Sequence, residues 1–245
     1  MNRITGGMAL TLISACARAT ILTNIAIQDL NGRGGEDVLQ QTAEYVEFKN
    51  DGSSHIYNRK ALFLFSFTNF AGRDVMDQYL HSALFRVHAR DNHDTNNHVR
   101  LWGFTDAMGN RDSAWHEGIT AQTDPNWLAG YWGAYWYPSG NGVTGVETQR
   151  GVRNNQPITF SGSGLLNYCR WGADRHPTYG YSTSNPDGRI TFMLNREEEK
   201  YTQDGIHARE STEDGGIYKP YLVLDVRFPS LRVGLGTSNN LPAGG

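Results

Sequence analysis

An aromatic segment near the middle of the chain carries the residue types best suited to binding sugars. Six tryptophan and tyrosine residues fall within the eleven positions WLAGYWGAYWY, with two glycines among them. Flat aromatic faces stack on the C–H faces of sugar rings and lose water when covered. The same rings could instead pack a long loop against the domain, or form a protein interface, where aromatic residues are enriched. The candidate platform comprises Trp127, Tyr131, Trp132, Tyr135 and Trp136.

Acidic and amide side chains near the N-terminus give a weaker signal for a metal. Calcium takes carboxylate and carbonyl oxygen ligands, and the candidates for it are Asp29, Asn31, Glu36 and Asp37. The spacing of these residues is not that of an EF-hand, and the eight histidines of the chain form no HExxH motif. We therefore expect no cofactor, with calcium as the alternative.

A further group has the residue types with which polysaccharide lyases abstract a proton next to a uronate carboxylate. Tyr201, Gln203, His207 and Arg209 fall within nine positions. Their order does not follow that of lyase motifs, and the three glutamates at 197–199 would repel an anionic substrate. The sequence also lacks a Gly-x-Ser-x-Gly elbow and a phosphate loop. We expect no enzyme and keep a lyase as the alternative.

Period-two alternation of apolar residues predicts the strands that must position these groups. Turns rich in Gly, Asn, Asp and Ser, such as 31–35 and 184–188, separate them. The sequence has no long amphipathic helical pattern, so we expect an all-β fold, an antiparallel β-sandwich. The predicted strands are 20–27, 43–49, 61–67, 82–89, 99–104, 158–160, 189–194 and 221–228.

Two segments lack strand periodicity. Residues 106–157 contain the aromatic run and are expected to form a long aromatic loop insertion, because long loops in compact domains are usually functional or disordered and aromatic content argues against disorder. After Phe228 the apolar pattern fades into Gly, Ser, Asn and Pro. We expect residues 229–245 to be a flexible tail or linker.

Residues 1–19 have the order of a secretory signal peptide: basic Arg3, a short apolar core, then small residues. The core is too short for a transmembrane helix, which needs about 20 residues. Cleavage before Thr20 would release a domain at 20–228. The sequence ISAC also resembles a bacterial lipobox, in which Cys16 would be lipidated. Both routes predict a protein that is secreted or attached to the cell surface.

Cysteine content and net charge further restrict how the domain is stabilised and which partners it binds. The chain has two cysteines, Cys16 and Cys169, and the first lies inside the predicted signal. The mature domain would then have no internal disulfide and would depend on its packed core, for which its length suffices. The net charge of −3 disfavours general nucleic-acid binding.

Several segments, taken together, resemble the conserved motifs of a known domain family. They are the strand RKALFLF at 59–65, DSAWHEGIT at 112–120, ARE at 208–210 followed by KPYLVL at 219–224, and the glycine-rich turn at 32–35. Taken in their order along the chain, they resemble the motifs of the DNRLRE domain family, which includes carbohydrate-binding module family 96 and disaggregatase-related domains. The resemblance extends over nearly all of the predicted mature chain.

The resemblance implies a β-sandwich of jelly-roll type that is usually secreted and does not imply catalysis. It also implies polysaccharide binding, with acidic polymers such as alginate as one ligand class. A uronate polymer would need cationic groups to pair with its carboxylates. The basic residues inside the matching segments are Arg59, Lys60 and Arg209. Arg59 and Arg209 could instead form structural ion pairs with Glu210 or Glu117.

These observations predict a non-catalytic extracellular carbohydrate-binding domain for an acidic polysaccharide. Its expected partner is an extracellular polysaccharide, with no nucleic acid and with membrane contact only through a lipid anchor at Cys16. One alternative is a structural or adhesive surface protein that self-assembles through the same aromatic residues. A linked enzyme domain and the lyase are the remaining alternatives.

Overall fold

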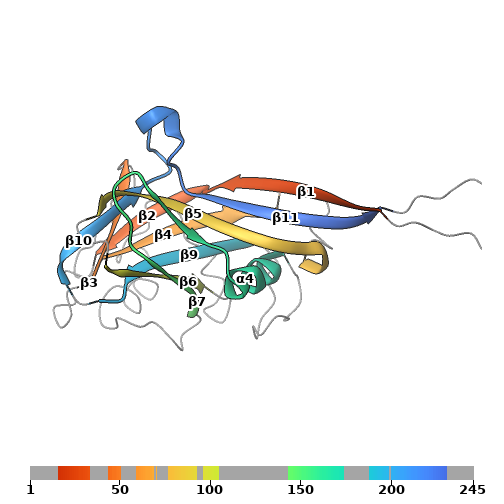
Figure 1. The fold of residues 1–245 in the computed structure, drawn as a ribbon, viewed down its shortest axis with the longest axis horizontal. Coiled ribbons are helices and arrows are strands. Elements are labelled where there is room, and N and C mark those ends of the chain that lie inside the picture. The colour runs from red at the N-terminus through yellow and green to blue at the C-terminus, as the bar shows by residue number, and fades with distance from the viewer. Residues whose placement is uncertain are drawn as a thin grey trace, which may run out of the picture.

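The computed structural model describes residues 16–33, 44–50, 59–68, 70, 77–92, 96–104, 143–173, 188–198 and 200–230. These residues form mainly β-strands (Figure 1). The elements in chain order are β1 (Cys16–Ile25), β2 (Gln28–Arg33), β3 (Tyr45–Asn50), β4 (Arg59–Ser66), β5 (Leu80–Asn92), β6 (His98–Phe104), β7 (Val143–Arg150), β8 (Pro157–Phe160), α4 (Ser163–Ala173), β9 (Arg189–Arg196), β10 (Lys200–His207), η3 (Glu213–Gly216) and β11 (Tyr221–Ser230).

The strands pair antiparallel throughout the described part of the chain. Their order is β1-β11-β5-β10-β3-β4-β9-β6-β7, while β2 lies beside β4 and β8 lies beside β5. This long sheet curls, and the predicted all-β class is confirmed: the fold agrees with a β-sandwich of jelly-roll type (Figure 1).

Phenylalanine rings fill the space between the two layers of the curled sheet. Phe85 of β5 stacks on Phe192 of β9 with ring centroids 4.8 Å apart, and it also meets Phe65 of β4 edge-on at 5.6 Å. Neither β4 nor β9 is hydrogen-bonded to β5, so these contacts cross the core. Each buried ring of this kind stabilises the fold by about 1.5–3 kcal/mol relative to an exposed one.

Strand β4 is buried along nearly its whole length, with residues from Lys60 to Phe65 all in the interior. Strand β9 is buried from Ile190 onward. A strand covered on both faces does not need to alternate, which explains the continuous apolar run ALFLF.

Helix α4 is an element that the sequence did not predict. Its N-terminal end is held by Glu147, whose carboxylate accepts the backbone N–H groups of Ser161 (2.9 Å) and Gly162 (2.7 Å). Tyr168 then packs against Gly103 of β6, where a Cβ would lie 2.6 Å from the ring, and donates its hydroxyl to a β9 carbonyl. The short helix therefore depends on tertiary contacts rather than on its own propensity.

The structure corrects three further expectations. Strand β7 lies inside the 106–157 region that was predicted to be irregular, and residues 106–142 of that region fall outside the described residues. Strand β10 was not predicted. The predicted turn at 31–35 is wrong for its first part, because β2 continues to Arg33 and pairs there with Arg59.

Strands β1 and β11, which pair with each other, extend past the predicted domain limits. Strand β1 begins at Cys16, which pairs with Ser230 of β11, so its first four residues precede the predicted cleavage point. Strand β11 likewise runs two residues into the predicted tail. Among the described residues, none of the helical segments has the length and hydrophobicity to cross a bilayer.

Candidate functional site

A polar pocket of about 420 Å³ opens where β5 ends. This volume lies within the range of about 300–1,000 Å³ that small-molecule sites occupy. The pocket gathers residues from three separate parts of the chain: the end of β5, the connection between β7 and β8, and η3. Its lining residues are Arg90, Asp91, Asn154, Asn155 and Glu213.

Arg90 enters the pocket because it is the extra residue of a β-bulge. Asp91 pairs with Gly205 of β10 and Ala89 pairs with Ile206, so Arg90 has no residue opposite it in this ladder. A bulge turns the side chain of its extra residue away from the regular alternation of the strand. The Arg90 guanidinium lies over the ring of Tyr45 at 4.4 Å and its Nε is 3.9 Å from Glu213.

Asn155 is held in the pocket by three contacts. Its φ of 62° is in the left-handed region, which asparagine tolerates better than most residues. Its backbone N–H donates to the carbonyl of Ala89 at 2.5 Å, and its side-chain Nδ2 donates to Glu213 at 3.4 Å. Its Oδ1 faces Nε2 of His207 at 3.1 Å.

His207 supports the pocket from the interior, where it is fully buried. Because the Asn155 Oδ1 can only accept, Nε2 must carry the proton, and Nδ1 of the neutral ring then accepts from the hydroxyl of Ser211 at 3.0 Å. Burial lowers the pKa of His207, although the charge of Glu213 opposes this. The ring also stacks on Tyr218 with centroids 4.8 Å apart. His207 therefore positions Asn155 and is itself out of reach of a ligand.

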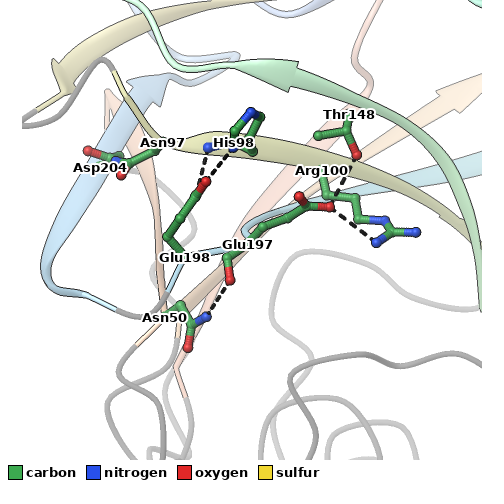
Figure 2. Close-up of polar contacts among 8 residues, drawn as sticks. All are labelled: Asn50, Asn97, His98, Arg100, Thr148, Glu197, Glu198 and Asp204. Atoms are coloured by element: carbon green, nitrogen blue, oxygen red, sulfur yellow. Dashed lines mark hydrogen bonds and ion pairs between the residues drawn. The ribbon is translucent and has the colours of Figure 1, made fainter.

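A second polar cluster surrounds the turn between β9 and β10 (Figure 2). Glu197 accepts from Arg100 of β6 at 3.1 Å and from Thr148 of β7 at 3.2 Å. Glu198 accepts the backbone N–H of His98 at 2.6 Å and also contacts the His98 ring. Burial of Glu198 raises its pKa, but these hydrogen bonds outweigh burial and leave the pKa lowered. Two of the three acids that were expected to repel anions, Glu197 and Glu198, are thus tied to neighbouring strands, and Glu199 lies outside the described residues.

A buried ion pair lies beside this turn. Arg196 of β9 and Asp204 of β10 meet at 2.5 Å, and both are almost completely buried. Asn97 donates its Nδ2 to Asp204 at 3.0 Å, and Arg196 donates to the Thr202 carbonyl at 2.6 Å. A buried charge is stable only when paired in this way. We therefore assign this cluster a role in fixing the hairpin rather than in binding.

The predicted sugar-binding residues fall in different places. The aromatic platform of Trp127, Tyr131, Trp132, Tyr135 and Trp136 lies outside the described residues. Arg59 forms an ion pair with Glu47, a partner that was not predicted from the sequence. Lys60 is buried, and burial lowers its pKa to about 7. Its ammonium group therefore does not lie on a surface that a polymer could contact.

Arg209 pairs with Glu210, as the structural alternative predicted. Its Nε donates to Oε1 of Glu210 at 2.7 Å, and its guanidinium also bonds the carbonyl of Ile27. The backbone N–H of Arg209 donates to the buried carboxylate of Asp29. Burial raises the pKa of Asp29 to about 8, the hydrogen bond from Arg209 opposes the rise, and the adjacent Glu210 adds to it.

Two of the four candidate calcium ligands, Asp29 and Asn31, are among the residues that the structure describes. Asp29 faces Arg209 and Glu210, Asn31 pairs through its backbone with Ala61 of β4, and Glu36 and Asp37 lie outside the described residues. Within the described ranges, side chains of His, Cys, Asp and Glu nowhere gather in a group of three or more that could hold a metal ion.

Sequence reasoning missed the pocket because none of its residues belongs to a motif. The available signal was the polar end of the strand around Arg90 and Asp91, followed by the Asn154–Asn155 pair before a proline-containing strand. Neither signal indicates that these segments meet. The contact depends on the bulge in β5 and on the path of the chain from β10 to β11.

Comparisons with known proteins give little further information. The chain matches no family model and no curated protein. Among solved structures it is similar to the structure of the Macrobrachium rosenbergii nodavirus, with 12% sequence identity and a TM-score of 0.20, over 95% of this chain and 60% of that chain. The chain thus spans less than two thirds of the nodavirus chain, and a TM-score this low does not establish a shared fold.

Proposed function

We propose that this protein is a non-catalytic, extracellular carbohydrate-binding domain. The observation that carries the proposal is the pocket at the end of β5, which presents two carboxylates, two amides and a guanidinium around one cavity. Sugar hydroxyls both donate and accept hydrogen bonds, so a mixed set of this kind suits them. The ring of Tyr45 lies against the guanidinium of Arg90 and helps to hold it in place. The sequence resemblance to DNRLRE domains supports the same ligand class.

The acidic polysaccharide expected from that resemblance receives less support from the described residues. The charge of Arg59 is paired with Glu47 and that of Arg209 with Glu210, while Lys60 is buried. These cations are therefore already engaged within the protein. Acidic polymers remain the first ligands to test, together with neutral ones.

Titration calorimetry of the full chain against alginate, polygalacturonate and neutral polymers tests the proposal. We expect a saturable heat with at least one of them and no change in polymer length after incubation. Absence of binding to every polymer would refute carbohydrate binding. Formation of unsaturated products from a uronate polymer, seen by ultraviolet absorbance, would instead establish the lyase alternative.

Self-assembly is the second candidate function, and strand β1 favours it. Among the described strands, β1 ends the order of the sheet and pairs with β11 alone. Ile21 and Ile25 project from its outer face and are 62% and 50% exposed, and Ile27 follows them at 37%. An exposed apolar edge strand is a template for pairing with a second copy.

Light scattering over a range of protein concentrations tests self-assembly. We expect the apparent mass of the wild-type chain to rise with concentration and that of Ile21→Lys to stay constant, because a charge on an edge strand blocks pairing. A wild-type protein that is monomeric at every concentration would refute this second function.

A further inference from the structure

The pocket at the end of β5 has a charge balance that bears on its ligand. Asp91 and Glu213 contribute two carboxylates, and Arg90 contributes the one guanidinium. Arg90 is already close to Glu213, at 3.9 Å between Nε and Oε2. The lining therefore carries one net negative charge, and a carboxylate that entered it would meet two like charges.

A neutral sugar unit meets no such repulsion. Its hydroxyls can donate to the carboxylates of Asp91 and Glu213 and accept from the guanidinium of Arg90. Hydrogen bonds to charged groups are stronger than those between neutral groups. The side chains of Asn154 and Asn155 add groups that can both donate and accept.

Asn155 is preorganised for this task. The Ala89 carbonyl fixes its backbone, His207 occupies its Oδ1, and its Nδ2 points toward Glu213 at the pocket wall. Since His207 and Ser211 are buried, this orientation is set before any ligand arrives. A group that is already ordered loses less conformational entropy on binding.

We propose that this pocket binds one neutral, hydroxyl-rich hexose unit of a glycan in preference to a uronate, with Asn155 as the residue that His207 positions. The inference rests on the proposed carbohydrate-binding function and names the ligand class of the same site. This neutral ligand differs from the acidic polysaccharide expected from the sequence. The reason is that the pocket lining has two carboxylates and one guanidinium.

The experiment uses calorimetry of the full chain with a soluble β-glucan, a galactomannan and dextran as neutral probes, and with alginate and polygalacturonate as uronate probes. We expect at least one neutral probe to bind about tenfold more tightly than either uronate, a difference of about 1.4 kcal/mol. Glu213→Gln removes one negative charge and retains the shape, so it should narrow that difference by strengthening uronate binding.

The variant Asn155→Gly tests the assignment to the pocket. Glycine adopts a φ of 62° without strain, so the backbone bond to Ala89 persists while the side chain is lost. We expect binding of the neutral probe to weaken about tenfold. The melting temperature should fall, because the buried Nε2–H of His207 loses its acceptor, and circular dichroism checks that the variant still folds. Arg90→Gln should also weaken binding, whereas Arg227→Gln, the same change at an exposed arginine of β11, should not.

The outcomes separate the two proposals. If no probe binds, carbohydrate binding fails and this inference fails with it. If a uronate binds most tightly, or if Asn155→Gly folds and binds the neutral probe as well as the wild type, carbohydrate binding stands and the assignment of a neutral unit to this pocket is overturned.

Discussion

Replacing Asp29 with asparagine should remove a large pH dependence of stability. Asp29 is 1% exposed, accepts the backbone N–H of Arg209 and lies next to the carboxylate of Glu210. Burial raises its pKa to about 8 from an ordinary value of 3.8. A carboxyl with a raised pKa in the folded state stabilises the protein below its unfolded pKa, and this contribution is lost as the pH rises through about 8.

The magnitude follows from the width of that pH window. A tenfold change in proton affinity corresponds to about 1.4 kcal/mol, so a window of about four pH units sets an upper limit of about 6 kcal/mol. Between about pH 5 and pH 9 the titration covers about three units of this window, up to the Asp29 pKa of about 8. We therefore expect the wild-type free energy of unfolding to fall by about 2–4 kcal/mol over that range because of Asp29.

Urea unfolding of the wild type and of Asp29→Asn at several pH values measures the effect. The asparagine keeps an acceptor for Arg209 and offers an N–H to Glu210, so the two proteins should be similarly stable near pH 5 and the variant more stable near pH 9. The difference between the two curves removes the contributions of groups that titrate in both proteins. Lys60 is one of these groups, and its lowered pKa makes the free energy of unfolding rise with pH. Parallel curves for the two proteins would refute the raised pKa.

Three further predictions concern packing, burial and the aromatic platform. Gly103→Ala should lower the free energy of unfolding by about 1–3 kcal/mol, since the new methyl would lie within 2.6 Å of the Tyr168 ring, and an unchanged urea midpoint would contradict that contact. Lys60→Met should stabilise the protein by about 2 kcal/mol more at pH 6 than at pH 10, because burial lowers the lysine pKa to about 7; equal gains at both values would refute this. Trp132→Ala and Trp136→Ala should weaken glycan binding about tenfold with unchanged melting temperatures, whereas unfolding of both variants would mean that the rings pack the loop.

Eight of the strands were predictable because burial leaves a pattern in the sequence. Strand β5 alternates Phe85, Val87 and Ala89 toward the core with Arg86 and His88 on the other side, and period two predicts such a strand. Strand β4 was predictable for a different reason, since a short apolar run rich in phenylalanine fits a strand that is buried on both faces.

The elements that escaped prediction are those whose stability comes from distant contacts. Helix α4 contains two glycines and has no acidic residue in its first turn, so local propensity does not favour it. Its first turn is completed by Glu147 of β7, and its Tyr168 depends on a glycine in β6. Strand β10 lacks a clear apolar alternation, because its buried residues include the charged Asp204.

The position of the pocket follows from the length of β5 and its change of partners. Along its first part β5 pairs with β11, and from Ala89 onward it pairs with β10, with the bulge between Ala89 and Asp91. On its other edge β8 ends at His88, and Ala89 instead exchanges hydrogen bonds with the loop residues Asn155 and Gln156. At this point the ladder with β8 ends and the ladder with β10 is interrupted by the bulge, so Arg90 is turned toward the loop residues Asn154 and Asn155. A pocket at such a discontinuity requires no change in the buried face of the strand, and the core and the pocket can therefore vary independently.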